Sequence, residues 1–189
     1  MEFFTAEQIG GWCGTHGLQV NENRFLNYGN SDLHCFSISL EQEKASSVIL
    51  LADYLVPTWP DVPFSGALFW IRERGIWGDF SENAGARMLQ QMRMADGATK
   101  LSGEFPGQLF AADELVEFHS YFLLPLLFGW DAFVVPEGTD HFLFVSHDGL
   151  VAAVSRGGEA LEELRQRVAD WNPKRDDRWY PRLAGPKKC

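Results

Sequence analysis

The stretch DAFVVPEGTDHFLFVSHDGLVAAVSR, residues 131–156, decides the fold expected for this chain. It holds three short runs rich in apolar and β-branched residues, which are typical of strands. The connections EGTD and HDG carry the turn residues of β-hairpins. The stretch therefore predicts an antiparallel three-stranded meander over residues 131–136, 141–146 and 150–156.

The hairpin loops predict which side chains share a face of this meander. If EGTD is a four-residue loop, Asp131 lies opposite Ser146, and if Asp148-Gly149 is a two-residue turn, His147 lies opposite Leu150. One face would then carry Phe133, Val135, Phe142, Phe144, Val151 and Ala153, and the other Ala132, Val134, Leu143, Val145, Ala152 and Val154. Because both faces are apolar, we expect other elements to cover both sides of the sheet.

Helical patterns alternate irregularly with strand patterns before the meander. Thr5 and Gln8 form a capping-box pattern at the start of a helical run that places Ile9 and Cys13 on one face. Further helices are expected at about residues 42–56, 81–95, 111–124 and 157–171, and strands at 33–40 and 67–73. This order predicts a single α+β domain with its helices packed on the sheet.

Charge divides the chain into an acidic body and a basic end. The net charge is −10, yet residues 172–189 hold six basic and two acidic side chains, so residues 1–171 carry 10 basic and 24 acidic ones, a net of −14. The end has no periodic apolar face, and we expect a domain at 1–171 with a flexible basic tail at 172–189. An acidic body repels nucleic-acid phosphates and anionic membranes and attracts basic proteins. The expected partner is therefore a basic protein.

The apolar stretches, the first residues and the cysteines of the sequence favour a cytoplasmic location. The longest apolar stretch, Tyr121–Trp130, is interrupted by Pro125 and is too short to span a bilayer as a helix. The start, MEFFTAEQIGG, lacks the basic residues of a secretory signal. The three cysteines, Cys13, Cys35 and Cys189, are a poor disulfide framework, so reduced thiols are expected.

The two histidines of the meander stand at opposite ends of one expected strand. At roughly 3.3 Å per residue, His141 and His147 are about 20 Å apart and cannot share a metal ion. We expect both to occupy turns. The alternative is a polar acid–base cluster at one end of the sheet, formed by Asp131, Ser146, His147 and Asp148.

Cysteine and histidine also recur near the start of the chain. Cys13, His16, His34 and Cys35 could form a zinc set, but neighbouring strand residues point to opposite faces, so we expect no metal and no cofactor. Cys13 and His16 could instead form a nucleophile–base pair. The C-terminal end of a helix disfavours a thiolate, and a buried, inert Cys13 is the favoured interpretation.

Aromatic and acidic residues in expected loops are candidates for a binding surface. Tryptophans beside loops can anchor an interface, and acidic neighbours speed encounter with a basic partner. The candidate binding residues are Trp59, Trp77, Glu73, Asp79 and Glu82, and Trp179 has a similar setting.

Common catalytic signatures are missing from the sequence. The Walker, H-E-x-x-H, G-x-S-x-G, C-x-x-C and G-x-G-x-x-G patterns do not occur, which argues against the common nucleotide-binding, zinc-protease and α/β-hydrolase classes. Two hypotheses remain. The favoured one is a non-enzymatic interaction domain, such as an inhibitor or immunity-type protein that binds a basic partner. The alternative is a small hydrolase or transferase that uses Cys13 with His16, or His147 with Asp131 and Asp148.

Overall fold

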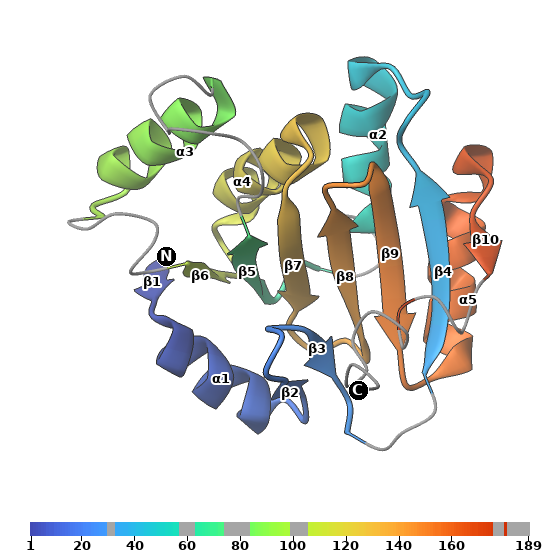
Figure 1. Ribbon diagram of the computed structural model, residues 1–189, viewed down its shortest axis with the longest axis horizontal. Helices are drawn as coiled ribbons and strands as arrows, with labels where there is room; N and C mark the ends of the chain where they lie inside the picture. Colours follow the sequence, from blue (N-terminus) through green and yellow to red (C-terminus); the bar gives the residue numbers. More distant parts are fainter. Residues whose placement is uncertain (30–32, 57–62, 74–83, 99–105, 176–179, 181–189) are drawn as a thin grey trace.

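The computed structural model describes residues 1–29, 33–56, 63–73, 84–98, 106–175 and 180. In these residues the fold is α+β and is built on one sheet with the strand order β1-β6-β5-β7-β8-β9-β4-β10, in which all neighbours are antiparallel (Figure 1). The strands are β1 (Glu2–Phe4), β4 (His34–Ser39), β5 (Gly66–Glu73), β6 (Gly107–Ala111), β7 (Asp131–Pro136), β8 (His141–Ser146), β9 (Leu150–Ser155) and β10 (Lys174–Arg175). A separate hairpin pairs β2 (Gln19–Val20) with β3 (Leu26–Asn27).

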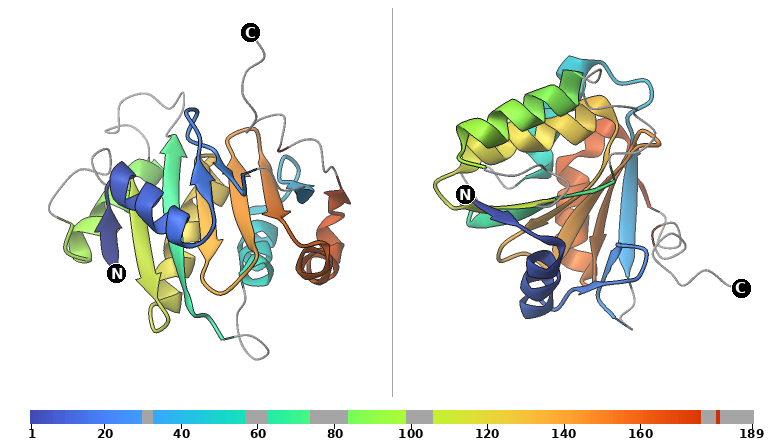
Figure 2. Two further views of the ribbon diagram at one scale, coloured as in Figure 1. Left: turned by 90° about the horizontal axis from the view of Figure 1, so that it is seen from below. Right: turned by 60° about the vertical axis from the view of Figure 1, so that its left-hand side comes forward.

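The helices cover both faces of this sheet, as its apolar faces require (Figure 2). They are α1 (Ala6–Thr15), α2 (Ala45–Leu55), α3 (Ala84–Ala95), α4 (Leu115–Phe128), α5 (Gly158–Arg167) and the short 3₁₀ helix η1 (Ala169–Trp171). Buried residues of α2, α3, α4 and α5 share one hydrophobic core with one face of the sheet. Buried residues of α1 and the β2–β3 hairpin share a second core with the other face. The sheet is thus the middle layer of three.

The start of α1 confirms the capping box. The Thr5 hydroxyl accepts the Gln8 backbone N–H, and the Gln8 side chain accepts the Thr5 backbone N–H. These reciprocal bonds satisfy two backbone donors that a helix start leaves open. Ile9 and Cys13 lie on the buried face of this helix, as their spacing predicts.

One of the two hairpins of the meander has the predicted register, and the other does not. Strands β7 and β8 pair in the expected register, with Phe133 opposite Phe144. The second turn was predicted wrongly, because Ser146 lies opposite Leu150 and residues 147–149 form a three-residue loop. A slip of one residue turns every side chain of a strand to the other face. Accordingly, Val151 and Ala153 lie in the core beneath α2–α5, whereas Ala152 and Val154 lie in the core with α1.

The sheet is larger than the predicted meander because it includes the expected strands β4 and β5 and also segments that carry little strand signal. Strand β6 was not predicted as a strand, and its last residue, Ala111, stands where a helix was expected to begin. It pairs with β5 on one side and β1 on the other. It begins with Gly107, and glycine is depleted in strands. Adding a side chain at Gly107 would bring its Cβ within 2.8 Å of Ile9, so the glycine allows α1 to approach the sheet.

The last helix before the meander runs past its proline. Helix α4 includes Pro125 and ends at Phe128, and the left-handed conformation of the next residue, Gly129 (φ 63°), suits a helix C-cap. No helix in the described part of the chain is long and apolar enough to span a bilayer.

Part of the segment assigned to a tail contacts the domain. Lys174 and Arg175 form β10 and pair with Ser37 and Phe36 of β4. Tyr180 is fully buried in the core beside α1, and its hydroxyl donates a hydrogen bond of 2.8 Å to the Leu26 carbonyl.

Candidate functional site

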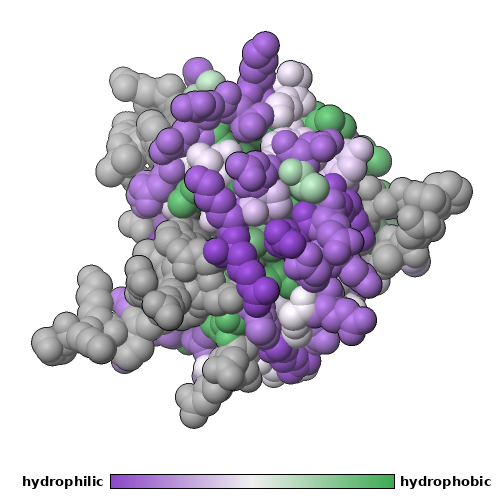
Figure 3. Space-filling model, turned by 90° about the vertical axis from the view of Figure 1, so that its right-hand side faces the viewer, coloured by the Kyte–Doolittle hydropathy of each residue, from purple (hydrophilic) through white to green (hydrophobic). Residues whose placement is uncertain are grey.

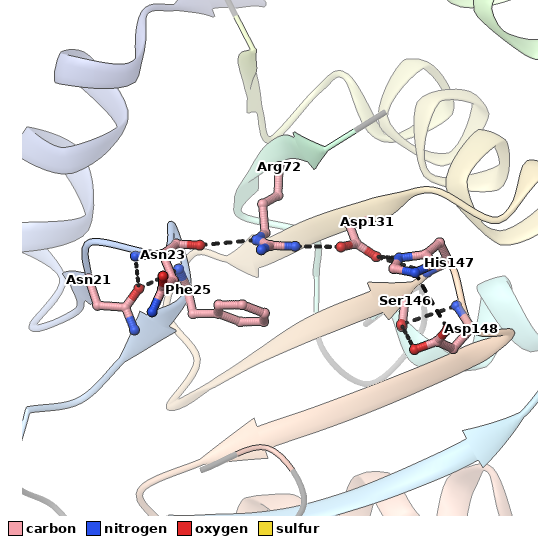
Figure 4. A network of polar contacts seen from close by, with 8 residues as sticks. All are labelled: Asn21, Asn23, Phe25, Arg72, Asp131, Ser146, His147 and Asp148. Atoms are coloured by element: carbon pink, nitrogen blue, oxygen red, sulfur yellow. Dashed lines mark hydrogen bonds and ion pairs between the residues drawn. The ribbon is translucent and has the colours of Figure 1, made fainter. Parts of the chain in front are cut away.

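A polar network lies at the end of the sheet where β5, β7 and the β8–β9 loop meet (Figure 4). Asp131 is the first residue of β7. Arg72 is an extra residue in β5, because Ile71 pairs with Ala132 while Glu73 pairs with Asp131. Such a bulge changes the direction of a strand side chain.

Asp131 is the centre of this network. Its side chain is only 3% exposed, and one oxygen lies 2.5 Å from a terminal nitrogen of Arg72. The other oxygen accepts the backbone N–H of His147 and lies 2.8 Å from the ring Nδ1 of the same residue. A buried carboxylate needs this combination of a cation and hydrogen-bond donors to offset its desolvation.

The network continues from Arg72 into the β2–β3 hairpin. The Arg72 Nε donates to the Asn23 carbonyl at 3.3 Å, and its guanidinium lies 4.1 Å from the centre of the Phe25 ring. The Asn21 side chain in turn accepts the backbone N–H groups of Asn23 and Phe25. The Arg72–Asp131 pair therefore joins the hairpin on one face of the sheet to the end of the meander.

The other end of the network is open to solvent. The side chains of His147 and Asp148 are 39% and 71% exposed, and His147 Nε2 lies 3.4 Å from the Asp148 carboxylate. The Ser146 hydroxyl accepts the Asp148 backbone N–H at 3.2 Å. The structure therefore brings together Asp131, Ser146, His147 and Asp148. Because Nδ1 faces Asp131, any proton exchange with a substrate would take place at Nε2.

Cys13 and His16 are in settings that argue against a thiol enzyme. Cys13 is fully buried, and burial raises the pKa of its thiol to about 12, so the thiol is protonated at neutral pH. The His16 ring instead stacks on Trp12 at 3.8 Å, and its Nδ1 lies 2.8 Å from the Trp12 carbonyl.

The four residues of the candidate zinc set are spread over both faces of the sheet. Cys13 and Cys35 are both buried in the core beside α1. His34 faces the opposite side, where its ring lies 3.7 Å from the position of a Cβ built at Gly158 of α5. Among the residues that the structure describes, no three His, Cys, Asp or Glu side chains are grouped so that they could hold a metal ion.

Most of the candidate binding residues lie outside the described residues. These are Trp59, Trp77, Asp79 and Glu82, together with Trp179. Glu73 is the last residue of β5, where it pairs with Asp131.

Sequence reasoning missed two features of the described surface. The first is the contact of Arg72 with the buried Asp131. The second feature is α2, on which Ile49, Leu50 and Tyr54 are 42%, 49% and 40% exposed. The run SVILLADY predicts a helix that is apolar on most sides, but only the register of its packing shows which residues face outward.

Comparison with known proteins gives no match to any protein family, curated protein or solved structure.

Proposed function

We propose that this protein is an interaction domain that binds a basic protein partner through the outer surface of α2. The inhibitor or immunity type of protein is the specific form of this proposal, in which the acidic chain covers a functional surface of a basic protein. The observation that carries the proposal is the apolar outer surface of α2 in a chain with a net charge of −10.

Helix α2 covers one face of the sheet, and its outer surface is unusually apolar for such a helix. Its inner side supplies Val48, Leu51, Ala52 and Leu55 to the core, and its outer side also carries the apolar residues Ile49 and Leu50. Its only charged residue is Asp53. Solvated helices normally place charged and polar residues opposite the core. Exposed apolar residues beside a few polar ones favour contact with another macromolecule.

The groups around this apolar centre suit a basic partner. The Asp53 carboxylate is 51% exposed and lies 2.8 Å from His119 Nε2 of α4. Tyr54 lies beside Trp171, with ring centres 5.5 Å apart. Aromatic faces and a carboxylate both attract guanidinium and ammonium groups. We therefore expect the partner to present Arg or Lys beside an apolar patch that covers Ile49 and Leu50.

Affinity capture with matched variants tests this proposal. The full chain is immobilised, and a lysate of the source organism is passed over wild type and over Ile49→Ser/Leu50→Ser. The control is Met94→Ser, which removes an apolar side chain that is 64% exposed on α3. We expect wild type and the control to retain the same protein with a high pI, and the α2 variant to lose it. Retention of that protein by the α2 variant, or an acidic captured protein, would contradict the proposal.

A small hydrolase or transferase is a second candidate, favoured by the contact between Asp131 and His147. A buried carboxylate that fixes the Nδ1 side of an imidazole is the arrangement by which general bases are oriented. Hydrolysis of p-nitrophenyl acetate and p-nitrophenyl phosphate by wild type and His147→Gln tests this candidate. Turnover that disappears in the variant would support it, and equal rates in the two proteins would reject it.

A further inference from the structure

The exposed apolar residues of this protein are concentrated on two neighbouring helices, α2 and α4. In the described part of the chain seven large apolar side chains are exposed, and five of them belong to these helices: Ile49, Leu50 and Tyr54 on α2, and Val116 and Leu127 on α4. Hydrophilic residues dominate the side of the molecule at the β10 end of the sheet (Figure 3). The apolar exposure is therefore local.

Helices α2 and α4 lie side by side on one face of the sheet and run in opposite directions (Figure 2). Helix α2 follows β4 and α4 precedes β7 through short connections, and these two strands are themselves oppositely directed. Asp53, near the end of α2, lies 2.8 Å from His119, in the first half of α4. From this contact, one turn back along α2 leads to Ile49 and one turn forward along α4 leads to Leu123. These two residues therefore lie at the same level.

The outer side of α4 carries an apolar row that continues the outer surface of α2. Val116, Leu123 and Leu127 are separated by seven and four residues, so they lie along one side of the helix. Val116 is 75% exposed and Leu127 is 40% exposed, whereas Leu123 is half-buried against the core. Together with Ile49 and Leu50 of α2, these three residues form a continuous apolar area, here called the α2–α4 surface.

The charged residues within these two helices are acidic. Helix α2 contains Asp53, α4 contains Glu117, and neither helix contains Lys or Arg. Asp53 is 51% exposed, and Glu117, two residues before His119, is also exposed. The negative charge thus lies toward one end of the α2–α4 surface. A second copy of this chain, with its own net charge of −10, would be repelled, whereas a basic segment would be attracted.

We propose that the α2–α4 surface receives an amphipathic helix of the partner, whose apolar side covers Ile49 and Leu123. Its Lys or Arg residues then lie beside Asp53 and Glu117. This inference rests on the proposed function and adds to it the second helix of the surface and the kind of segment that binds.

The shape of the surface favours a helix as the bound segment. A helix presents apolar side chains at three- and four-residue spacings and packs on other helices with axes about 8–10 Å apart. At about 1.5 Å per residue, the row from Val116 to Leu127 is about 16 Å long, which corresponds to three turns of a bound helix. A bound strand would instead need the unpaired backbone groups of a sheet edge, which two helices do not offer.

Titration of the full chain with a designed peptide tests this inference. The probe is the acetylated and amidated peptide LKKLLKLLKKLLKL, whose leucines gather on one side of a helix. One control has Glu in place of every Lys, and the other has the same composition with the leucines spread around the helix. We expect the probe to bind at least tenfold more tightly than either control, to become helical by circular dichroism, and to shift the amides of both Ile49 and Leu127. Equal affinity for either control would overturn the inference.

Variants locate the binding to α4. Val116→Ser/Leu127→Ser should weaken binding of the probe at least tenfold, and Met94→Ser, an equally exposed change on α3, should leave it within twofold of wild type. Val116→Ser alone provides the same comparison if the double variant unfolds. Glu117→Gln should also weaken binding, and Glu163→Gln, at an exposed acid of α5, should not. Equal effects in the α4 variant and in Met94→Ser would overturn the inference.

The basic protein captured through α2 distinguishes this inference from the proposed function. Its loss by Ile49→Ser/Leu50→Ser and also by Val116→Ser/Leu127→Ser would support both. Its loss by the α2 variant and retention by the α4 variant would leave the proposed function intact and overturn the extension to α4. Its retention by both variants would contradict the proposed function and, with it, this inference.

Discussion

The carboxylate of Asp131 holds His147 at two points, the backbone N–H and the ring Nδ1, each at 2.8 Å. The backbone contact fixes the first residue of the β8–β9 loop, and the ring contact fixes the orientation of the imidazole. Because Arg72 contacts the other oxygen, the same carboxylate also joins β5 to this loop. Asp131 is therefore a structural residue whether or not His147 performs chemistry.

Replacement of Asp131 should destabilise the fold more than replacement of the histidine that it holds. Asp131→Ala removes the carboxylate from Arg72, whose side chain is only 16% exposed, and from the His147 N–H. Removal of one partner from a buried ion pair costs about 3–5 kcal/mol of unfolding free energy. His147→Ala keeps the backbone contact and should cost only about 1 kcal/mol. Urea denaturation measures both, and equal losses in the two variants would contradict this role of Asp131.

Gly149 should tolerate asparagine better than valine. Its φ of +71° lies in the left-handed region, which β-branched residues resist and asparagine adopts more readily. Gly149→Val should lower the unfolding free energy by roughly 1–3 kcal/mol through backbone strain. Either substitution adds a Cβ 3.3 Å from the Glu41 side chain, so Gly149→Asn is a control for that contact. Equal melting temperatures for the two variants would show that φ is not the cause.

The register of the β8–β9 hairpin could not be predicted from the sequence. The pattern SHDGL is compatible with a two-residue or a three-residue hairpin loop, because glycine is favoured at a positive φ in both. Both faces of β9 are apolar, so its hydrophobic pattern does not distinguish the two registers. Strands β7 and β8 and the cap of α1 were predictable because local residues determine them. The contact of Arg72 with Asp131 was not, because it joins residues 59 positions apart.

Protonation of His141 should destabilise the protein in mild acid. Burial, with a smaller contribution from the charge of Arg167, lowers the pKa of His141 from 6.5 to about 4. Between these values the unfolded chain binds more protons than the folded one, so stability is lost as the pH falls from about 6.5 to 4. The loss should reach roughly 3 kcal/mol, at 1.36 kcal/mol for each pKa unit.

The variant His141→Leu isolates this contribution. Its unfolding free energy should fall less steeply than that of wild type over the same pH range, because the other titrating groups are unchanged. Chemical denaturation at half-unit pH intervals gives the two curves. Parallel curves between pH 6.5 and 4 would mean that His141 titrates normally in the folded protein.

Tyr180 should be required for the stability of the domain although it lies beyond residue 171. Tyr180→Ala removes a fully buried aromatic side chain from the core beside α1, which typically costs about 3–5 kcal/mol. Tyr180→Phe keeps the ring and removes only the hydrogen bond to the Leu26 carbonyl, with an expected cost of about 1 kcal/mol. Thermal and urea unfolding measure both. A Tyr180→Ala variant as stable as wild type would place the residue outside the core.

The proposal of a basic partner is tested most directly by the salt dependence of its association rate. The captured protein is passed over the immobilised full chain in surface plasmon resonance at increasing NaCl concentration, with Asp53→Asn as the variant. Exposed charges are screened beyond about 8 Å at physiological ionic strength, so the association rate should fall steeply with salt for wild type. It should be lower for Asp53→Asn at low salt and converge with wild type at high salt. An association rate that does not change with salt, and is equal in the two proteins, would contradict electrostatic recognition of a basic partner at α2.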